Sequence, residues 1–339
     1  MGMKWSVATN MLELSNISNV PFEIQSILAG DTGRLSEFFR QTGLAGIELN
    51  LYEDWEPAAF PPEWIHGVHL RFWPNWLDFW REDRAALGRE FGSDEAWQQS
   101  FGSTRADWVT QWRHHIRQAV RTGAEYVVFH VSQERPSEIF GRQYAYTDEE
   151  VIEAVLPLVN EIMVDLPEDC QLLYENLWWP GLTFCQPALA ARLLAGTSHQ
   201  NTGFMLDTGH LMNTCLELRD EQAAADYVCR IIDGLGDLRE KIYGLHLHCS
   251  LSGPFVRETM KQYDGKSRTP LSWPEVFAYI ARTDQHQPFR TKAARQIVDL
   301  VQPRYLVHEF VQESWVDWLE KVKIQRTALG WYEESRCHG

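Results

Sequence analysis

Short apolar runs alternate along the sequence with longer segments of helical periodicity, and this alternation limits the possible folds more than any other feature. Eight runs rich in Val, Ile, Leu and Phe recur. Most are continuously apolar, which is typical of strands that are buried on both faces of a parallel sheet. The runs cover residues 5–10, 46–51, 67–72, 126–132, 171–177, 203–211, 242–249 and 304–310.

The segments between these runs carry helix signals. Residues 107–122 place four apolar side chains, among them Trp108 and Trp112, on one face, and Gly123 follows in the C-cap position. Acidic residues at 148–150 suit the first turn of another helix. Eight strands that alternate with helices predict an α/β fold, the (β/α)8 TIM barrel.

One connection in this pattern is too long for a simple barrel. Over fifty residues, about 73–125, separate the third run from the fourth, and they include six of the 15 tryptophans. This insertion leaves the C-terminal end of a strand, where barrel active sites lie. It suits a lid, a substrate platform or a subunit interface, which leaves homo-oligomerisation open. Without any linker, low-complexity tract or repeat, we expect one domain over residues 1–339.

The composition argues against several classes of protein. The net charge is −16 and the pI is about 5.2, which is the wrong sign for binding DNA or RNA by their phosphates. The six cysteines form no CxxC pair, which indicates reduced thiols in a cytoplasmic protein. No stretch approaches 18 uncharged apolar residues, and no signal peptide is visible. We therefore expect no nucleic-acid partner and no membrane association.

Imidazole and carboxylate side chains follow the apolar runs, at the strand ends that converge on the mouth of a barrel. Charged groups there are costly to bury unless they are paired or bind a metal ion. Cys249 is the one thiol near these residues. The imidazole and carboxylate side chains therefore suit Mn²⁺, Mg²⁺, Co²⁺ or Zn²⁺ as the bound ion. The polar residues at these ends are His69, His130, Glu175, Asn176, Asp207, His210, His246, His248, His308 and Glu309.

Five motifs carry a resemblance that covers nearly the whole chain. They are VVFHVS at 127–132, LLYENL at 172–177, FMLDTGH at 204–210, GLHLHCS at 244–250 and YLVHEF at 305–310. The Asp-Thr-Gly-His step after a buried strand is the most specific of them. The chain resembles the xylose isomerase-like TIM-barrel superfamily, which includes sugar isomerases and epimerases, inosose dehydratases and endonuclease IV-type abasic-site nucleases.

The resemblance implies a site for one divalent metal ion (Mn, Mg, Co or Zn) and allows a second. The implied ligands, one from each of the last four strands, are Glu175, Asp207, His246 and Glu309. In the epimerase branch the two glutamates also act as acid and base on opposite faces of the substrate. The residue that matches His210 contacts the substrate in that branch and binds an additional metal ion in the nuclease branch.

The nuclease branch adds two further metal sites. His69 and His130 match the histidines that hold a second ion together with the strand-five glutamate. The third ion needs His210 and an Asp-x-His shortly after strand seven, where the nearest match is Asp264-Gly265-Lys266. A protonated lysine cannot coordinate a metal ion. This departure, together with the acidic charge, argues against an abasic-site nuclease.

These observations favour a divalent-metal-dependent isomerase or epimerase of a sugar or polyol ketone. Such a reaction removes a weakly acidic C–H proton, for which Glu175 and Glu309 are the candidate groups, through an enediolate that the cation stabilises. A dehydratase of a related, inosose-type substrate starts with the same proton abstraction, so the ligand set does not separate the two. Two further functions stay open: an endonuclease IV-like metal-dependent phosphodiesterase and, last, a barrel that binds sugar without turnover.

Further residues are candidates for contacts with the substrate. They are His210, His248, Trp73, Trp178, Trp179, Lys266 and Arg268. Each could instead have a structural role: packing for the tryptophans, a solvated loop for the cations, and hydrogen bonds within the mouth for the histidines. Glu48 in the second run is also placed to point at the site. His308 precedes Glu309 and is therefore expected to point into the helix layer.

Overall fold

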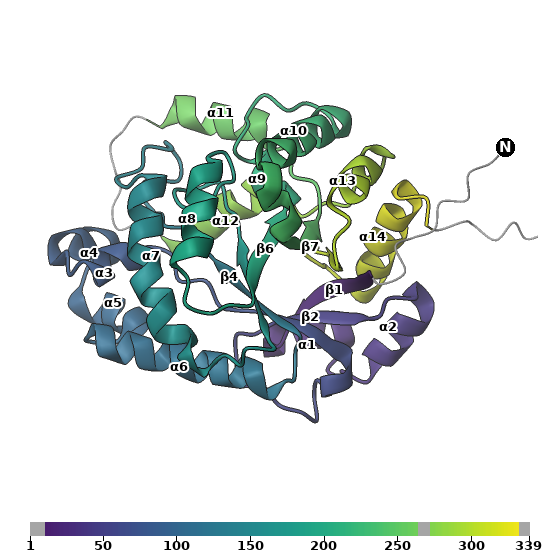
Figure 1. The fold of residues 1–339 in the computed structure, drawn as a ribbon, viewed down its shortest axis with the longest axis horizontal. Coiled ribbons are helices and arrows are strands. Elements are labelled where there is room, and N and C mark those ends of the chain that lie inside the picture. The colour runs from purple at the N-terminus through teal and green to yellow at the C-terminus, as the bar shows by residue number, and fades with distance from the viewer. Residues whose placement is uncertain (1–10, 264–271, 332–339) are drawn as a thin grey trace, which may run out of the picture.

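Eight parallel strands form a closed barrel at the centre of the fold (Figure 1). The structure is a computed structural model that describes residues 11–263 and 272–331. Each strand pairs with the next in chain order, and β8 pairs with β1, so the predicted (β/α)8 barrel is confirmed. The strands are β1 (Leu12–Ser18), β2 (Gly46–Asn50), β3 (Ile65–His69), β4 (Tyr126–His130), β5 (Gln171–Glu175), β6 (Thr202–Asp207), β7 (Ile242–Leu247) and β8 (Tyr305–His308).

Helices surround the barrel on its outer face (Figure 1). They are α1 (Pro21–Leu28), α2 (Arg34–Thr42), α3 (Trp76–Trp80), α4 (Arg84–Phe91), α5 (Asp94–Phe101), α6 (Arg105–Arg121), α7 (Asp148–Ile162), α8 (Pro187–Gly196), α9 (Thr208–Met212), α10 (Glu221–Gly234), α11 (Gly253–Gln262), α12 (Trp273–Thr283), α13 (Ala293–Val301) and α14 (Trp315–Ala328). Short 3-10 turns occupy Pro62–Trp64, Met163–Asp165 and Gly236–Lys241. None of the helices in the described part of the chain is long and apolar enough to cross a membrane.

The first barrel strand lies later in the chain than the sequence predicts. The expected strand at residues 5–10 falls outside the described residues, and β1 fills the place between β2 and β8. Its sequence, LELSNIS, contains polar residues where a continuous apolar run was expected. These polar groups are buried because the barrel satisfies them: Ser15 donates to the His308 carbonyl, and Asn16 exchanges hydrogen bonds with the backbone of Phe310.

The insertion after β3 consists of three short helices, α3 to α5, packed beside the long helix α6 (Figure 1). Its aromatic residues pack mainly on one another, since the buried Trp108 ring contacts the rings of Trp73, Trp76 and Trp112. A buried ion pair anchors the insertion to the loop after β4, where Asp78 accepts two hydrogen bonds from Arg135 at 2.8 and 2.7 Å. The tryptophans thus build the insertion itself.

A second insertion precedes the last strand. Helices α11 and α12 lie between β7 and the barrel helix α13. Tyr279 of α12 packs on Phe140 from the loop after β4 and on Phe255 of α11. These residues belong to an aromatic cluster that also contains Trp178 and Trp179 from the loop after β5. The cluster connects three of the loops at the C-terminal ends of the strands.

Candidate metal centre

The candidate ligands lie directly above an apolar layer inside the barrel. Residues two apart on a strand point to the same face. Four strands therefore bring an apolar side chain inward and, two residues later, an imidazole or carboxylate at the mouth. These pairs are Val128 and His130, Leu173 and Glu175, Met205 and Asp207, and Val307 and Glu309. The register of the strands gathers the polar side chains at one end.

The first group of ligand atoms (His69, His130 and Glu175) joins β3, β4 and β5. Nε2 of His69 lies 2.8 Å, and Nε2 of His130 lies 3.0 Å, from Oε2 of Glu175. The glutamate side chain is fully buried, whereas the two imidazoles retain 10% and 13% exposure. The structure thus places both histidines of the expected second metal site on the same carboxylate oxygen.

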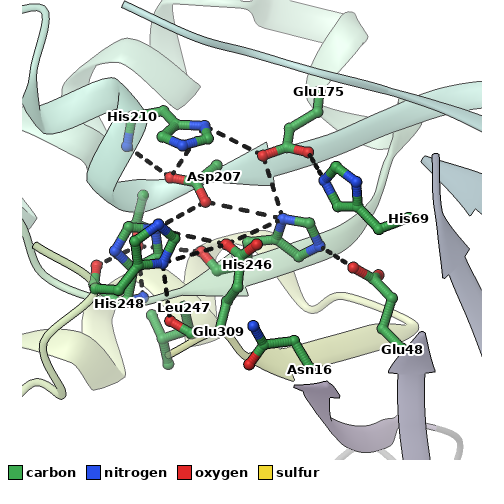
Figure 2. Close-up of polar contacts among 12 residues, drawn as sticks. Asn16, Glu48, His69, Glu175, Asp207, His210, His246, Leu247, His248 and Glu309 are labelled. Atoms are coloured by element: carbon green, nitrogen blue, oxygen red, sulfur yellow. Dashed lines mark hydrogen bonds and ion pairs between the residues drawn. The ribbon is translucent and has the colours of Figure 1, made fainter. Parts of the chain in front are cut away.

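The second group (Glu175, Asp207, His246 and Glu309) contains the four predicted metal ligands, whose ligand atoms lie within 4.8 Å of one another. Nδ1 of His246 faces the other three side chains (Figure 2). It lies 3.3 Å from Oε1 of Glu175, 3.4 Å from Oε2 of Glu309 and 3.8 Å from Oδ2 of Asp207. Because Glu175 uses Oε2 in the first group and Oε1 in the second, it connects the two groups.

The third group (His210, His248, Asp284 and His286) lies beside the second. Nε2 of His210 is 3.1 Å, and Nε2 of His286 is 2.7 Å, from Oδ2 of Asp284. His210 also connects this group to Glu175, whose Oε1 lies 3.1 Å from its Nδ1. Within the group, the ring of His248 stacks on that of His286 at 4.1 Å.

The sequence-based argument that the third site is incomplete relied on a different segment of the chain. The structure places Asp284-Gln285-His286 beside His210, and the segment 264–266 on which the argument relied lies outside the described residues. Helices α11 and α12 separate β7 from Asp284-Gln285-His286, so a search close to the strand did not reach this motif. Considering every Asp-x-His after β7 would have identified it.

Second hydrogen bonds orient the histidines of the three groups. A neutral imidazole carries one N–H, so donating it leaves the other nitrogen unprotonated and able to bind a metal ion. Four of these rings have a partner for that N–H at the nitrogen opposite the one that faces the other ligand atoms of its group. The bonds are His69 Nδ1 to the Leu70 carbonyl (3.0 Å), His210 Nδ1 to the Asn176 carbonyl (2.9 Å), His246 Nε2 to Glu48 (2.9 Å) and His286 Nδ1 to the Glu309 carbonyl (3.3 Å).

The buried carboxylates of these groups favour the binding of a positive ion. Oε1 of Glu175, Nδ1 of His246 and Oε2 of Glu309 are buried, face one another and form no hydrogen bond. Burial would lower the pKa of His246, but the carboxylates of Glu309, Glu48 and Glu175 outweigh burial and raise that pKa well above its ordinary value. The buried acidic and histidine groups therefore fit divalent cations, which would replace these protons.

Aromatic side chains border the groups. The ring of Trp178 lies 5.2 Å from that of His210, and Trp179 packs on Trp178 at 4.3 Å. Phe72, which the sequence reasoning passed over, lies 5.0 Å from the ring of His130. In the sequence, only the position of Phe72 directly after β3 indicated that it could lie at the site. Trp73 instead packs on Trp112 within the insertion, so we leave it out of the site.

The remaining sequence candidates divide between the site and its surroundings. His248 is fully buried, and its Nε2 donates to Oδ2 of Asp207 at 2.8 Å. Gly209 makes room for it, because a Cβ there would overlap the imidazole. His308 lies in the helix layer as expected, between Glu13 and Gln325. Lys266 and Arg268 fall outside the described residues.

Comparisons with known proteins agree with this architecture. Residues 36–289 match the family model described as xylose isomerase-like TIM barrel, whereas no curated protein matches the sequence. The structure is similar to endonuclease IV from Thermus thermophilus, with a TM-score of 0.52 and 16% identity over 94% of this chain and 99% of that chain.

Two sugar epimerases are also similar to it. For L-ribulose 3-epimerase the TM-score is 0.49 and the identity 13%, over 94% of each chain. For 3-keto-D-glucoside 4-epimerase from E. coli the values are 0.46 and 11%, over 95% of this chain and 98% of that chain. At 16% identity, the similarity to endonuclease IV shows the fold and not the reaction.

Proposed function

The chain belongs to the xylose isomerase-like TIM barrel family, and we propose that it is a metal-dependent hydrolase of phosphate esters that uses three divalent ions. The observation that carries this proposal is the presence of three adjoining groups of ligand atoms at one barrel mouth, with Glu175 shared by two of them. A fourth set of close ligand atoms, from Glu48, His69 and His246, shares His69 with the first group and His246 with the second. An isomerase that uses one ion would need only the second group. Sites with neighbouring ions are typical of phosphatases and nucleases.

The side chains of the three groups have distinct tasks in this proposal. Bound divalent ions polarise a phosphoryl oxygen and lower the pKa of a water molecule. Glu175 holds the first two groups at a fixed separation through its two oxygens. Phe72 and Trp178 exclude water beside the groups and offer apolar faces to the organic part of the ester. The His210 ring is held by its bond to the Asn176 carbonyl.

The charge of the chain favours a small ester over a nucleic acid. A polyanion would approach a protein of net charge −16 against long-range repulsion, which excess Lys and Arg would otherwise offset. We therefore propose a phosphorylated small molecule as substrate, and treat abasic DNA as an outcome for the assay to decide.

Isomerase or epimerase activity is the second candidate, and one observation favours it. The second group is a complete ligand set by itself, and Glu175 and Glu309 flank Nδ1 of His246 at 3.3 and 3.4 Å. Two carboxylates around one cation suit the removal and return of a proton at a carbon next to a carbonyl. A dehydratase would use the same arrangement.

Two measurements on the full chain separate these candidates. The first is the metal content of protein purified without a metal-affinity column, for which we expect about three ions per chain. The second compares hydrolysis of p-nitrophenyl phosphate, bis-p-nitrophenyl phosphate and an abasic duplex with deuterium uptake from D₂O into a panel of ketoses. Hydrolysis with several ions supports the proposal. One ion and deuterium uptake without hydrolysis would overturn it in favour of the isomerase.

A matched pair of variants links any hydrolysis to the proposed groups. His130→Asn removes one ligand of the first group, whereas His308→Asn removes a buried histidine of the helix layer that faces Glu13 rather than the groups. We expect the first variant to lose hydrolysis and the second to keep it. Equal losses would mean that activity follows stability and not metal binding.

A further inference from the structure

Glu48 is a buried carboxylate inside the barrel with two hydrogen bonds and no exposed surface. Its side chain projects from β2 toward the lower side of the second group (Figure 2). Oε1 accepts from Nε2 of His246 at 2.9 Å, and Oε2 accepts from the hydroxyl of Tyr126 at 2.7 Å. Burying a carboxylate in an apolar interior costs free energy, so the position of Glu48 beneath the metal ligands indicates a function.

The bond to His246 determines which of its nitrogens is free. With Nε2–H donated to Glu48, Nδ1 has no proton in the neutral ring, and it is the nitrogen that faces Glu175, Asp207 and Glu309. Nδ1 forms no hydrogen bond of its own. Without an acceptor beneath the ring, the imidazole could rotate or adopt the other tautomer, which would turn an N–H toward the carboxylates.

Tyr126 in turn fixes the carboxylate from below. Its ring is fully buried and packs on that of Tyr305 with the centroids 4.3 Å apart. Gly67 on the neighbouring strand makes room for it, because a Cβ there would overlap the ring. Tyr126, Glu48 and His246 thus form a continuous hydrogen-bonded chain from the apolar layer of the barrel to the second group.

We propose that Glu48 is a positioning residue that locks His246 in the orientation and tautomer that bind a metal ion through Nδ1. Partners of this kind raise the basicity of the ligand, and their loss typically costs about 10–100-fold in metal affinity. The inference rests on the proposed metal centre but not on the reaction, because it concerns the binding of an ion to the second group.

A glutamate–histidine pair elsewhere in the barrel provides a matched control. Glu13 lies 2.7 Å from Nε2 of His308, in the helix layer and away from the three groups. Both pairs join a carboxylate to a buried imidazole, but only one imidazole faces metal ligands. Glu13→Gln therefore reports the effect on stability of weakening such a pair together with the ion pair that Glu13 forms with Arg326, and Glu48→Gln adds the effect on metal binding.

The experiment measures Co²⁺ binding by the full chain, from visible absorption and chelator competition, together with the thermal unfolding midpoint. We expect Glu48→Gln to weaken the binding of one ion by about 10–100-fold and to alter the absorption of the remaining complex. Tyr126→Phe should weaken it less, because Glu48 stays in place without its second bond. Glu13→Gln should leave Co²⁺ affinity unchanged.

Each possible result either supports or overturns the positioning role of Glu48. Wild-type affinity in Glu48→Gln would overturn the positioning role, and so would equal losses of affinity in Glu48→Gln and Glu13→Gln. If Glu48→Gln does not fold, Tyr126→Phe decides: wild-type affinity and absorption overturn the role, and weaker binding at an unchanged unfolding midpoint supports it. A wild-type chain that binds no ion would refute the metal centre itself and this inference with it, an outcome distinct from the others.

Discussion

Replacing Glu175 should change the metal content more than replacing any other ligand, because this carboxylate is shared. Its Oε2 serves the first group and its Oε1 the second, whereas Asp284 serves the third group alone. In Glu175→Gln the first group keeps two imidazoles and the second keeps Asp207, His246 and Glu309. An amide oxygen without charge is a weaker ligand for a divalent cation than a carboxylate.

The expected magnitude follows from this sharing. At a free Zn²⁺ concentration that just saturates the wild type, Glu175→Gln should retain about one of three ions, since two groups lose a charged ligand. Asp284→Asn, which also converts one buried carboxylate to an amide, should retain about two. The comparison holds the type of substitution constant and changes only the number of groups affected.

The assay is elemental analysis after dialysis against zinc buffers of fixed free concentration, with circular dichroism to verify folding. Hydrolysis measured on the same samples should be lost in Glu175→Gln. The reasoning is refuted if Glu175→Gln keeps as many ions as the wild type, or if Asp284→Asn loses as many as Glu175→Gln. Either result would mean that the groups do not bind ions as the geometry indicates.

Three further predictions concern other parts of the molecule. Gly209→Ala should displace the ring of His248 and reduce metal affinity while leaving the barrel folded, as chelator competition and circular dichroism would show. The pKa of His115 is lowered to about 3 by burial and nearby cations, below its unfolded value of about 6.5. Stability from this group is thus present above pH 6.5 and falls by about 1.4 kcal/mol per unit toward pH 3, a contribution that His115→Gln should remove from the total slope measured by urea unfolding. Asp78→Ala should destabilise the fold by about 1–3 kcal/mol in the same assay, because the hydrogen bonds that Arg135 and Tyr146 donate to Asp78 are lost and Arg135 keeps only Glu138 as a partner.

The barrel could be predicted from the sequence because it depends on strand register, and the same register explains why the four ligands that the resemblance implies lie close together. Glu175 and Asp207 each end a continuous apolar run, and a strand that is buried on both faces has no use for a carboxylate except at the mouth. The first strand was misplaced because β1 carries Ser15 and Asn16, whose burial depends on hydrogen bonds to β8 and the loop after it. Such partners are distant in sequence and leave no local pattern.

The third group was missed for a related reason. Asp284 and His286 lie in a loop that follows α12, and no strand register positions them. They reach the mouth because the loop pairs back on the end of β7, where Gln287 and Cys249 exchange backbone hydrogen bonds at 2.7 and 3.2 Å. Glu48 shows the opposite case: alternation on β2 predicted that it points inward, but its bond to His246 became visible only in three dimensions.

The charges of the site show why protons and metal ions must compete for it. Five buried carboxylates converge there, and every ion pair that they form within the described residues is with a histidine. These carboxylates belong to Glu48, Glu175, Asp207, Asp284 and Glu309. Burial would lower the pKa of His210, yet Asp207 and Asp284 raise it well above its ordinary value, as the carboxylates around His246 do there. Without ions the histidines therefore hold protons that binding must displace, so metal affinity should rise with pH while these groups titrate.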